Sequence, residues 1–306
     1  MSNDQLKSLR NSIDTIDVEI QHLLTQRAEI SLEVKKVKPD GDIKLKPGRE
    51  AQILRALIER HKGHFPKTGI VQVWREIFSA SLQAQGTFSL AVYSPEDGEM
   101  DGWGYIASTR GHFGVHTPMT SHSSKHRVIE AILEDECSVG ILPVPSRHED
   151  SPWWRHLAVQ GNTKKDGTPS KPARIIAKLP FAVKKSDRTA TKGEPLDCLV
   201  IAKSNADPSG LDSTYVVLDL SRTTTTTQIE ARLIKSGMTG SVVTIWHDSQ
   251  APERWLCLIC IDSYVLATDA KLDRLTDGIS ENLNHATILG SYAVPFSADM
   301  LASEDI

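Results

Sequence analysis

The stretch DQLKSLRNSIDTIDVEIQHLLTQRAEISLEVKKVK, residues 4–38, decides the fold of the N-terminal part of the chain. Its apolar residues are spaced alternately three and four positions apart, which predicts one long helix that packs along other helices. They are Leu6, Leu9, Ile13, Ile16, Ile20, Leu23, Ile30, Val34 and Val37. At 1.5 Å per residue this helix is about 50 Å long. A compact domain that ends near residue 86 is too small to cover it, so we expect a partner chain to share it.

Two shorter helices are expected after the first. Residues 39–42 (PDGD) break the first helix, and Pro47 is a favourable first-turn residue for a second helix that runs to about residue 61. A third helix is expected from about residue 69 to residue 85, where Gly86 ends it. Residues 1–86 are therefore predicted to form an all-α domain of three helices.

After residue 88 the pattern changes to short β-rich segments separated by turn residues. Strands are expected at 88–93, 139–144, 196–202, 214–220, 242–246 and 255–261, and helices near 125–134, 228–236 and 271–283. This mixture predicts α/β and α+β domains in the C-terminal part. Residues 161–172 and 184–195 are expected to be loops, and the last ten residues carry no packing pattern.

Composition and charge exclude several classes of protein. Of the 306 residues, 39% are hydrophobic and 24% charged, which is typical of a globular protein. No apolar stretch approaches the roughly 18 to 20 residues of a membrane span, so no membrane partner is expected. The net charge of −4 argues against a nucleic-acid partner. Residues 1–86 hold 14 basic and 11 acidic residues, against 21 and 28 in the remainder, so an anionic ligand is expected in the N-terminal part.

The predicted location is the cytoplasm. The four cysteines have no framework spacing, which is typical of a reducing compartment. Residues 1–4 (MSND) lack the basic and apolar regions of a secretory signal.

Polar residues interrupt the apolar seam of the first helix. Arg27 occupies the seam position after Leu23, where burying a guanidinium is costly unless an anion compensates it. A structural salt bridge, or an arginine at the edge of the seam, is the alternative interpretation. Lys38 lies three turns further on and only about 20° from Arg27 around the helix axis. The two cations are therefore able to hold a small dianion between them.

The other two helices carry polar residues at comparable positions. Ser81 and Gln85 continue the apolar stripe of the third helix, although Gln85 also lies near the helix end. Arg49 and Glu50 open the second helix, where a solvated charge pair is the alternative. Together with the seam arginine these residues predict a polar, net-cationic cavity inside a helical bundle.

Five segments carry a family resemblance: LKSLRNSIDTID at 6–17, LTQR at 24–27, VKKVK at 34–38, PGRE at 47–50 and WREIFSASLQAQ at 74–85. In order and spacing they resemble the all-helical chorismate mutases over residues 5–86. The resemblance implies an intertwined homodimer, without cofactor or metal, that rearranges chorismate to prephenate.

The resemblance also implies a role for each matching residue. The implied substrate-binding set is Arg10, Arg27, Lys38, Arg49, Glu50, Ser81 and Gln85, and its implied catalytic members are Arg27, Lys38, Glu50 and Gln85. Arg10 would reach in from the partner chain and bind the substrate carboxylates with Arg27 and Lys38. Glu50 would accept a hydrogen bond from the substrate hydroxyl, and Gln85 would lie near the ether oxygen. Lys46 departs from the pattern, because some relatives carry an acidic ligand to the hydroxyl there.

The chemistry of this reaction fits such a residue set. A pericyclic rearrangement needs no nucleophile and no proton transfer, so the lack of a catalytic triad is no objection. The enzyme has to hold a flexible dianion in its reactive conformer. It also has to stabilise the negative charge that develops on the ether oxygen, which fixed donors such as Lys38 and Gln85 are able to do.

The C-terminal part carries a second resemblance. Residues 127–144 (RVIEAILEDECSVGILPV) look like part of a prephenate dehydratase, and residues 289–292 (LGSY) resemble the closing strand of an ACT-type regulatory domain. The implied organisation is a chorismate mutase-like domain at 1–86, a shortened dehydratase-like domain at 88–203, an ACT-like domain at 204–297 and a tail at 298–306.

The details predict that dehydratase activity is lost. Residues 196–198 (LDC) stand where the dehydratases carry a Thr-Arg-Phe motif, and the carboxylate of Asp197 would repel a dianionic substrate. The effector loop of the regulatory domain is replaced by Thr223–Thr227, so phenylalanine binding in the usual mode is not expected. A bifunctional mutase and dehydratase and a non-catalytic sensor of aromatic metabolites are the alternatives.

Two clusters of metal-binding residue types have plainer interpretations. Cys257 and Cys260 lie in a hydrophobic run without a second ligand pair, which favours core thiols over zinc. The other cluster comprises His112, His116, His122 and His126. Its irregular spacing favours a surface loop over a metal site.

Overall fold

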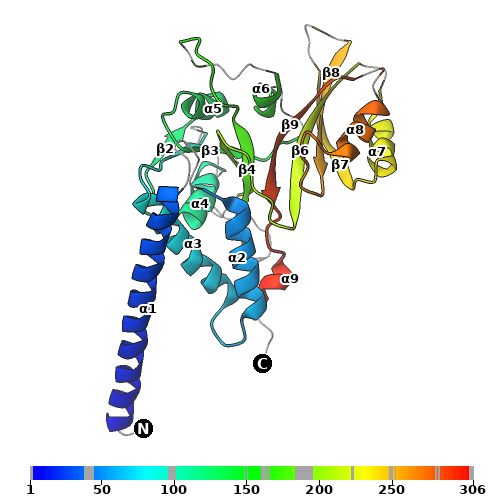
Figure 1. Cartoon of the computed structure of the whole chain (residues 1–306). Helices are drawn as coiled ribbons and strands as arrows, with labels where there is room; N and C mark the ends of the chain where they lie inside the picture. Colours follow the sequence, from blue (N-terminus) through cyan, green and yellow to red (C-terminus); the bar gives the residue numbers. More distant parts are fainter. Residues whose placement is uncertain are drawn as a thin grey trace.

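The computed structural model describes residues 3–37, 45–95, 101–147, 149, 151–159, 164, 166–182, 196–221, 224–247, 251, 253–279, 281 and 283–302. Lys38 and the expected loop 184–195 lie outside these residues. The described chain forms a long helical arm, two shorter helices and a body built on one mixed sheet (Figure 1).

The N-terminal helices agree closely with their predicted bounds. α1 spans Asn3–Val37, α2 spans Pro47–Arg60 and α3 spans Lys67–Ala84. α1 projects away from the body (Figure 1), and none of its described residues is buried. Ile13 is 58% exposed and Ile30 is 65% exposed although both belong to the apolar seam. The all-α fold is confirmed, and most of the seam lies uncovered in a single chain.

The first turn of α2 is capped from a distant part of the chain. Pro47 occupies the first turn, and the side chain of Lys46 makes no capping hydrogen bond. Instead the Asp207 carboxylate accepts from the backbone N–H of Gly48 at 3.0 Å and from that of Arg49 at 2.8 Å. A carboxylate is stabilising here because it satisfies free amides at the positive end of the helix dipole.

After the three helices, the described residues form a nine-stranded sheet in the order β2-β1-β3-β5-β4-β9-β6-β8-β7. The strands are β1 Leu90–Tyr93, β2 Met119–His122, β3 Val139–Pro143, β4 Arg174–Leu179, β5 Cys198–Ala202, β6 Asp212–Ser221, β7 Gly240–His247, β8 Arg254–Ile261 and β9 Leu283–Ala293. β1 runs parallel to β2 and to β3, β4 runs parallel to β9, and the other pairs are antiparallel. Strands from both expected C-terminal domains therefore belong to one sheet.

The two halves of this sheet meet at a glycine. β4 pairs with β9 between Ile175 and Gly290, which has a φ of +135°. A Cβ atom at Gly290 would lie 2.1 Å from the carbonyl oxygen of Ile175. Both the close approach and the positive φ require glycine here.

Helices cover both faces of the sheet. They are α4 Asp101–Phe113, α5 Lys125–Leu133, α6 Trp154–Val159, α7 Thr226–Lys235 and α8 Ala270–Asp277, while α9 Ala298–Leu301 packs beside α2. Along β1, Ala91 packs in the same cluster as α5, whereas Leu90 and Val92 pack with Phe113 of α4. Successive strand residues point to opposite faces, so α4 and α5 lie on opposite faces of β1. The mixed α/β class expected for the C-terminal part is confirmed.

Several elements differ from the sequence expectation. α4, α6, β2 and β4 were not expected, and α8 ends at Asp277 because Leu283 already begins β9. Residues 298–301 form α9 instead of lacking a packing pattern, since Leu301 is buried with Phe296 and Phe181. The same apolar cluster includes Leu54 of α2, so the tail, the helical domain and the sheet body share one core.

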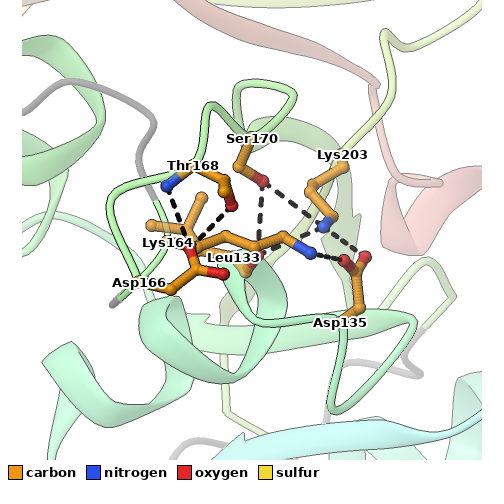
Figure 2. A network of polar contacts seen from close by, with 7 residues as sticks. All are labelled: Leu133, Asp135, Lys164, Asp166, Thr168, Ser170 and Lys203. Atoms are coloured by element: carbon orange, nitrogen blue, oxygen red, sulfur yellow. Dashed lines mark hydrogen bonds and ion pairs between the residues drawn. The ribbon is translucent and has the colours of Figure 1, made fainter.

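A polar network fixes the loop around residues 164–170 to the end of α5 (Figure 2). Asp135 has a φ of +61° and binds Lys164 at 2.7 Å and also Lys203. These two lysines lower the pKa of Asp135 by donating hydrogen bonds to it. The carbonyl of Leu133 accepts from Lys203 and from Ser170, which satisfies the end of the helix. The network is structural and lies apart from the helical domain.

Candidate functional site

The first part of the site is a contact between α1 and α3. Arg27 Nη1 donates a hydrogen bond to Ser81 Oγ at 2.8 Å, and its guanidinium carbon lies 5.5 Å from the centre of the Phe78 ring. Ser81 Oγ also lies 2.8 Å from the carbonyl of Ile77, to which it donates. Partial burial lowers the pKa of Arg27, and the nearby Glu50 carboxylate opposes that shift. The seam arginine thus faces the interior of the helical domain while keeping its charge.

A second contact lies one helical turn further along. Gln85 is buried, and its Nε2 donates to Ser31 Oγ at 2.7 Å. Ser31 follows Arg27 by four residues, and Gln85 follows Ser81 by four, so α1 and α3 run in the same direction with their polar side chains in register. The helices therefore meet along a polar strip, as the interrupted seams predict.

The third part of the site is a buried ion pair between α2 and α3. Arg75 Nη1 lies 2.7 Å from Glu50 Oε2, and the two residues are 3% and 9% exposed. Burial raises the pKa of Glu50, while the charge of Arg75 lowers it and the charge of Asp207 raises it further. Burial also lowers the pKa of Arg75 to about 10, against the opposing charge of Glu50. Arg75 therefore stays a cation at neutral pH.

Two arginines of the expected substrate-binding set, Arg49 and Arg10, lie outside this site in a single chain. Arg49 is exposed, and its guanidinium donates to Gln52 Oε1 at 3.3 Å. Arg10 is exposed on the projecting part of α1, about 25 Å along the helix from Arg27 at 1.5 Å per residue. One chain thus brings Arg27 to Ser81 and near Glu50, and it brings Gln85 to Ser31 one turn further along, whereas Arg10 is not brought to them.

Sequence reasoning missed two residues of this site. The family resemblance implies no role for Arg75, and Asp207 lies far from the helical domain in the sequence. Their side chains reach Glu50 and the first turn of α2 only through the tertiary fold. Arg75 carries little local signal, because the neighbouring Glu76 makes it look like half of a solvated charge pair.

The expectation of one surface loop for the four histidines is wrong for three of them, because His122 belongs to β2, His126 to α5 and His112 to α4. This residue is buried at the end of α4 instead of lying on a surface loop, because α4 packs against α3 there. Cys257 is buried in the core of the C-terminal half, and Cys260 is half-buried and contacts the Tyr292 hydroxyl at 3.7 Å. Within the part of the chain that the structure describes, no group of three or more His, Cys, Asp or Glu residues is arranged to hold a metal ion.

Residues 196–198 stand where the dehydratases carry a Thr-Arg-Phe motif, and their contacts involve a carboxylate and a thiol. Asp197 pairs with Lys178 at 3.2 Å, and burial raises the pKa of the Cys198 thiol. The carbonyl of Leu196 accepts from Ser108 Oγ at 2.6 Å. The cationic Lys178 is thus engaged by a carboxylate at this position.

The three described helices thus bring together a partly buried arginine, a buried carboxylate, and amide and hydroxyl donors. The chorismate mutase type II family model matches residues 9–86, which include most of α1 and all of α2 and α3. The match confirms the resemblance of the N-terminal part and places a chorismate mutase type II domain there.

Curated relatives are similar to part of this chain. A bifunctional chorismate mutase/prephenate dehydratase from Pseudomonas aeruginosa is 28% identical over 152 residues, which are 48% of this chain and 40% of the relative. One from Aquifex aeolicus is 33% identical over 98 residues, or 30% of this chain and 27% of the relative. The chain thus spans less than half the length of these relatives. The longer alignment exceeds the helical domain, so the similarity continues into the region after it.

Solved prephenate dehydratases overlap loosely with the chain. The enzyme from Streptococcus mutans has 12% identity and a TM-score of 0.44 over 68% of this chain and 99% of that one. The enzyme from Arthrobacter aurescens in complex with L-Phe has 12% identity and a TM-score of 0.46 over 70% and 92%. Overlap at this level identifies no activity. None of the described helices has the length and apolar character to cross a membrane.

Proposed function

We propose that the N-terminal domain catalyses the rearrangement of chorismate to prephenate. The observation that carries this proposal is the gathering of Arg27, Glu50, Ser81 and Gln85 between three helices whose sequence matches the mutase family. Arg27 presents a fixed positive charge, and Glu50 presents a buried acceptor. A dianionic substrate with one hydroxyl needs both groups.

The proposed mechanism is orientation combined with electrostatic stabilisation. Arg27 binds a substrate carboxylate and holds the flexible side chain of chorismate over the ring. Gln85 and Lys38 donate to the ether oxygen as its bond breaks and negative charge develops there. Glu50 accepts from the ring hydroxyl, and Arg49 and Ser81 complete the pocket. The roles of Lys38, Arg49 and Arg10 rest on the family resemblance.

The proposed working form is a homodimer in which α1 of each chain lies against the other. The seam of α1 exposes large apolar side chains along most of its length, including Leu9, Ile16 and Leu23 at 51%, 53% and 62%. A stripe of this length is an interaction surface and not an ordinary exposed patch. The same packing supplies Arg10 of the partner to the site.

This arrangement predicts the effect of charges on the seam. The double variant Ile13→Glu and Ile16→Glu is expected to convert the dimer into a monomer, because it would bury two carboxylates in an apolar interface. The mass is measured by sedimentation velocity, and mutase activity is expected to fall with it because Arg10 is withdrawn. Val18→Glu is the matched control, since Val18 is 66% exposed but lies off the seam. Persistence of the dimer in the double variant would contradict the arrangement.

For the C-terminal part we propose a dehydratase-like region at 88–203 and an ACT-like region at 204–297 without dehydratase activity. The support is Asp197, which stands where the dehydratase motif has its arginine. Its carboxylate pairs with Lys178 instead of offering a cation to a dianionic substrate. The bifunctional enzyme and the non-catalytic sensor are the two alternatives. A cytoplasmic location fits the four cysteines, which are all free thiols.

One assay separates these three functions. The purified protein is incubated with chorismate, and prephenate and phenylpyruvate are quantified in the same sample. Prephenate alone is the expected result. Phenylpyruvate above the spontaneous background would show that the dehydratase-like region is active, and binding of chorismate without either product would favour the sensor.

A further inference from the structure

A third polar residue extends the Glu50–Arg75 pair into the sheet body. Arg75 Nη1 lies 2.7 Å from Glu50 Oε2 and 3.3 Å from His112 Nε2. His112 is 6% exposed and comes from α4, which lies outside the matched residues 9–86. The three side chains come from α2, α3 and α4 in turn. His112, a residue of the C-terminal part, thus contacts Arg75, which is the ion-pair partner of the proposed mutase residue Glu50.

The protonation state of His112 follows from its neighbour. Arginine has only donors, so His112 Nε2 has to be the unprotonated acceptor and the proton has to lie on Nδ1. Burial and the charge of Arg75 both hold the pKa of His112 well below its ordinary value, which agrees with a neutral ring. His112 Nδ1 has no hydrogen-bond partner among the described residues. The arginine therefore lies between an anion and a neutral acceptor.

Aromatic rings restrict Arg75 in the remaining directions. Its guanidinium carbon lies 6.0 Å from the centre of the Phe78 ring and 5.0 Å from that of Phe181. Rings attract a guanidinium to their faces but offer no lone pair in its plane. His112 supplies the second in-plane acceptor for the Nη1 that holds Glu50. Of these neighbours of Arg75, Glu50 and Phe78 come from the mutase-like domain, while Phe181 and His112 come from the sheet body.

This geometry fixes one oxygen of Glu50 and leaves the other open. Oε2 accepts from Arg75, and no residue in the described part of the chain donates a hydrogen bond to Oε1. A carboxylate whose rotation is stopped at one oxygen presents the other in a constant direction. That is the arrangement an acceptor for a substrate hydroxyl requires.

We propose that His112 is a positioning residue for the mutase reaction, which orients the Glu50 carboxylate toward the substrate hydroxyl by holding the Arg75 guanidinium. The proposal rests on the proposed function of the helical domain. It gives the C-terminal part a role in the mutase site itself: α4 completes a site whose substrate-binding residues all come from other helices.

The test compares three full-length variants by steady-state kinetics with chorismate. His112→Leu removes the acceptor and is expected to lower kcat by about tenfold, the change that corresponds to one lost hydrogen bond to a charged group. KM is expected to change much less, because Arg27 still binds the substrate. His112→Gln places an amide oxygen near the position of Nε2 and is expected to restore most of kcat.

The control addresses the packing of α3 on α4. Ser79→Ala removes a hydrogen bond from α3 to the carbonyl of Phe113 at 2.5 Å without touching Arg75 or Glu50, and it is expected to leave kcat unchanged. An equal loss in Ser79→Ala and His112→Leu, or no rescue by His112→Gln, would assign a packing role to His112 and overturn the proposal. Unchanged kcat in His112→Leu would also overturn it. Lack of mutase activity in the unmodified protein would instead refute the proposed function.

Discussion

Arg27→Ala is expected to lower kcat/KM for the conversion of chorismate to prephenate by about 10²- to 10³-fold, the usual effect of losing one preorganised donor in an active site. The guanidinium is held by Ser81 and by the face of Phe78, so its charge is already in place before the substrate binds. Alanine removes the charge and leaves a space that water fills. Initial rates of prephenate formation measure the loss.

The fold is expected to survive this substitution. Arg27 is only partly buried and makes a single hydrogen bond to a serine, so the far-ultraviolet circular dichroism and the thermal midpoint should change little. Arg60→Ala is the matched control, because it removes the same charge from an exposed position at the end of α2. Near-normal activity in Arg27→Ala would remove the central residue from the proposed mechanism.

Arg75→Met is expected to lower the free energy of unfolding by about 3–5 kcal/mol, because it leaves the Glu50 carboxylate buried without its cation. Methionine keeps most of the side-chain volume, so the loss reports on charge and not on a cavity. The double variant Arg75→Met and Glu50→Gln is expected to recover part of the stability, since no uncompensated charge remains. Urea unfolding monitored by circular dichroism measures each value.

The loss in Arg75→Met should also depend on pH. Without Arg75, the burial that already raises the pKa of Glu50 acts unopposed by that charge. A carboxyl whose pKa is higher in the folded than in the unfolded state contributes stability at low pH, and that contribution disappears as the pH rises through the folded pKa. Arg75→Met is therefore expected to be less destabilised at pH 5 than at pH 8. An equal loss at both values would contradict the burial of an unpaired charge.

A surface ion pair provides the comparison for this variant. Lys36 and Glu33 lie 2.6 Å apart on α1, with side chains that are 70% and 68% exposed. Lys36→Met is expected to leave the urea midpoint unchanged, because exposed pairs contribute little to stability. If Lys36→Met lowered the free energy of unfolding as much as Arg75→Met, burial would not explain the difference expected between the two ion pairs.

The helices of the N-terminal domain were predictable because their apolar residues repeat over many turns. α4 was not, since Gly102, Gly104 and Gly111 weaken its pattern and its helix amphipathicity is low. β2, which reads MTSH, is too short and too polar to be recognised. Both elements are held by packing on neighbours that are distant in the sequence.

The candidate site divides in the same way. Arg27, Ser81 and Gln85 were predictable because each breaks an apolar stripe on its own helix. All three lie in the contact between α1 and α3. His112 and Asp207 carry no such local mark. One is a histidine in a glycine-containing segment, and the other lies in a loop. Their importance arises only where α4 and the loop between β5 and β6 contact the helical domain.

The Asp207 cap has a consequence for anyone who wishes to excise the helical domain. The amides of Gly48 and Arg49 are satisfied by a carboxylate that a cut near residue 86 would remove. The first turn of α2, which carries Glu50, would then fray. Lys46 already occupies the capping position of that helix without filling the role, so an aspartate or serine there would allow α2 to cap itself. Replacing Lys46 is therefore the first substitution to make when the helical domain is to be expressed alone.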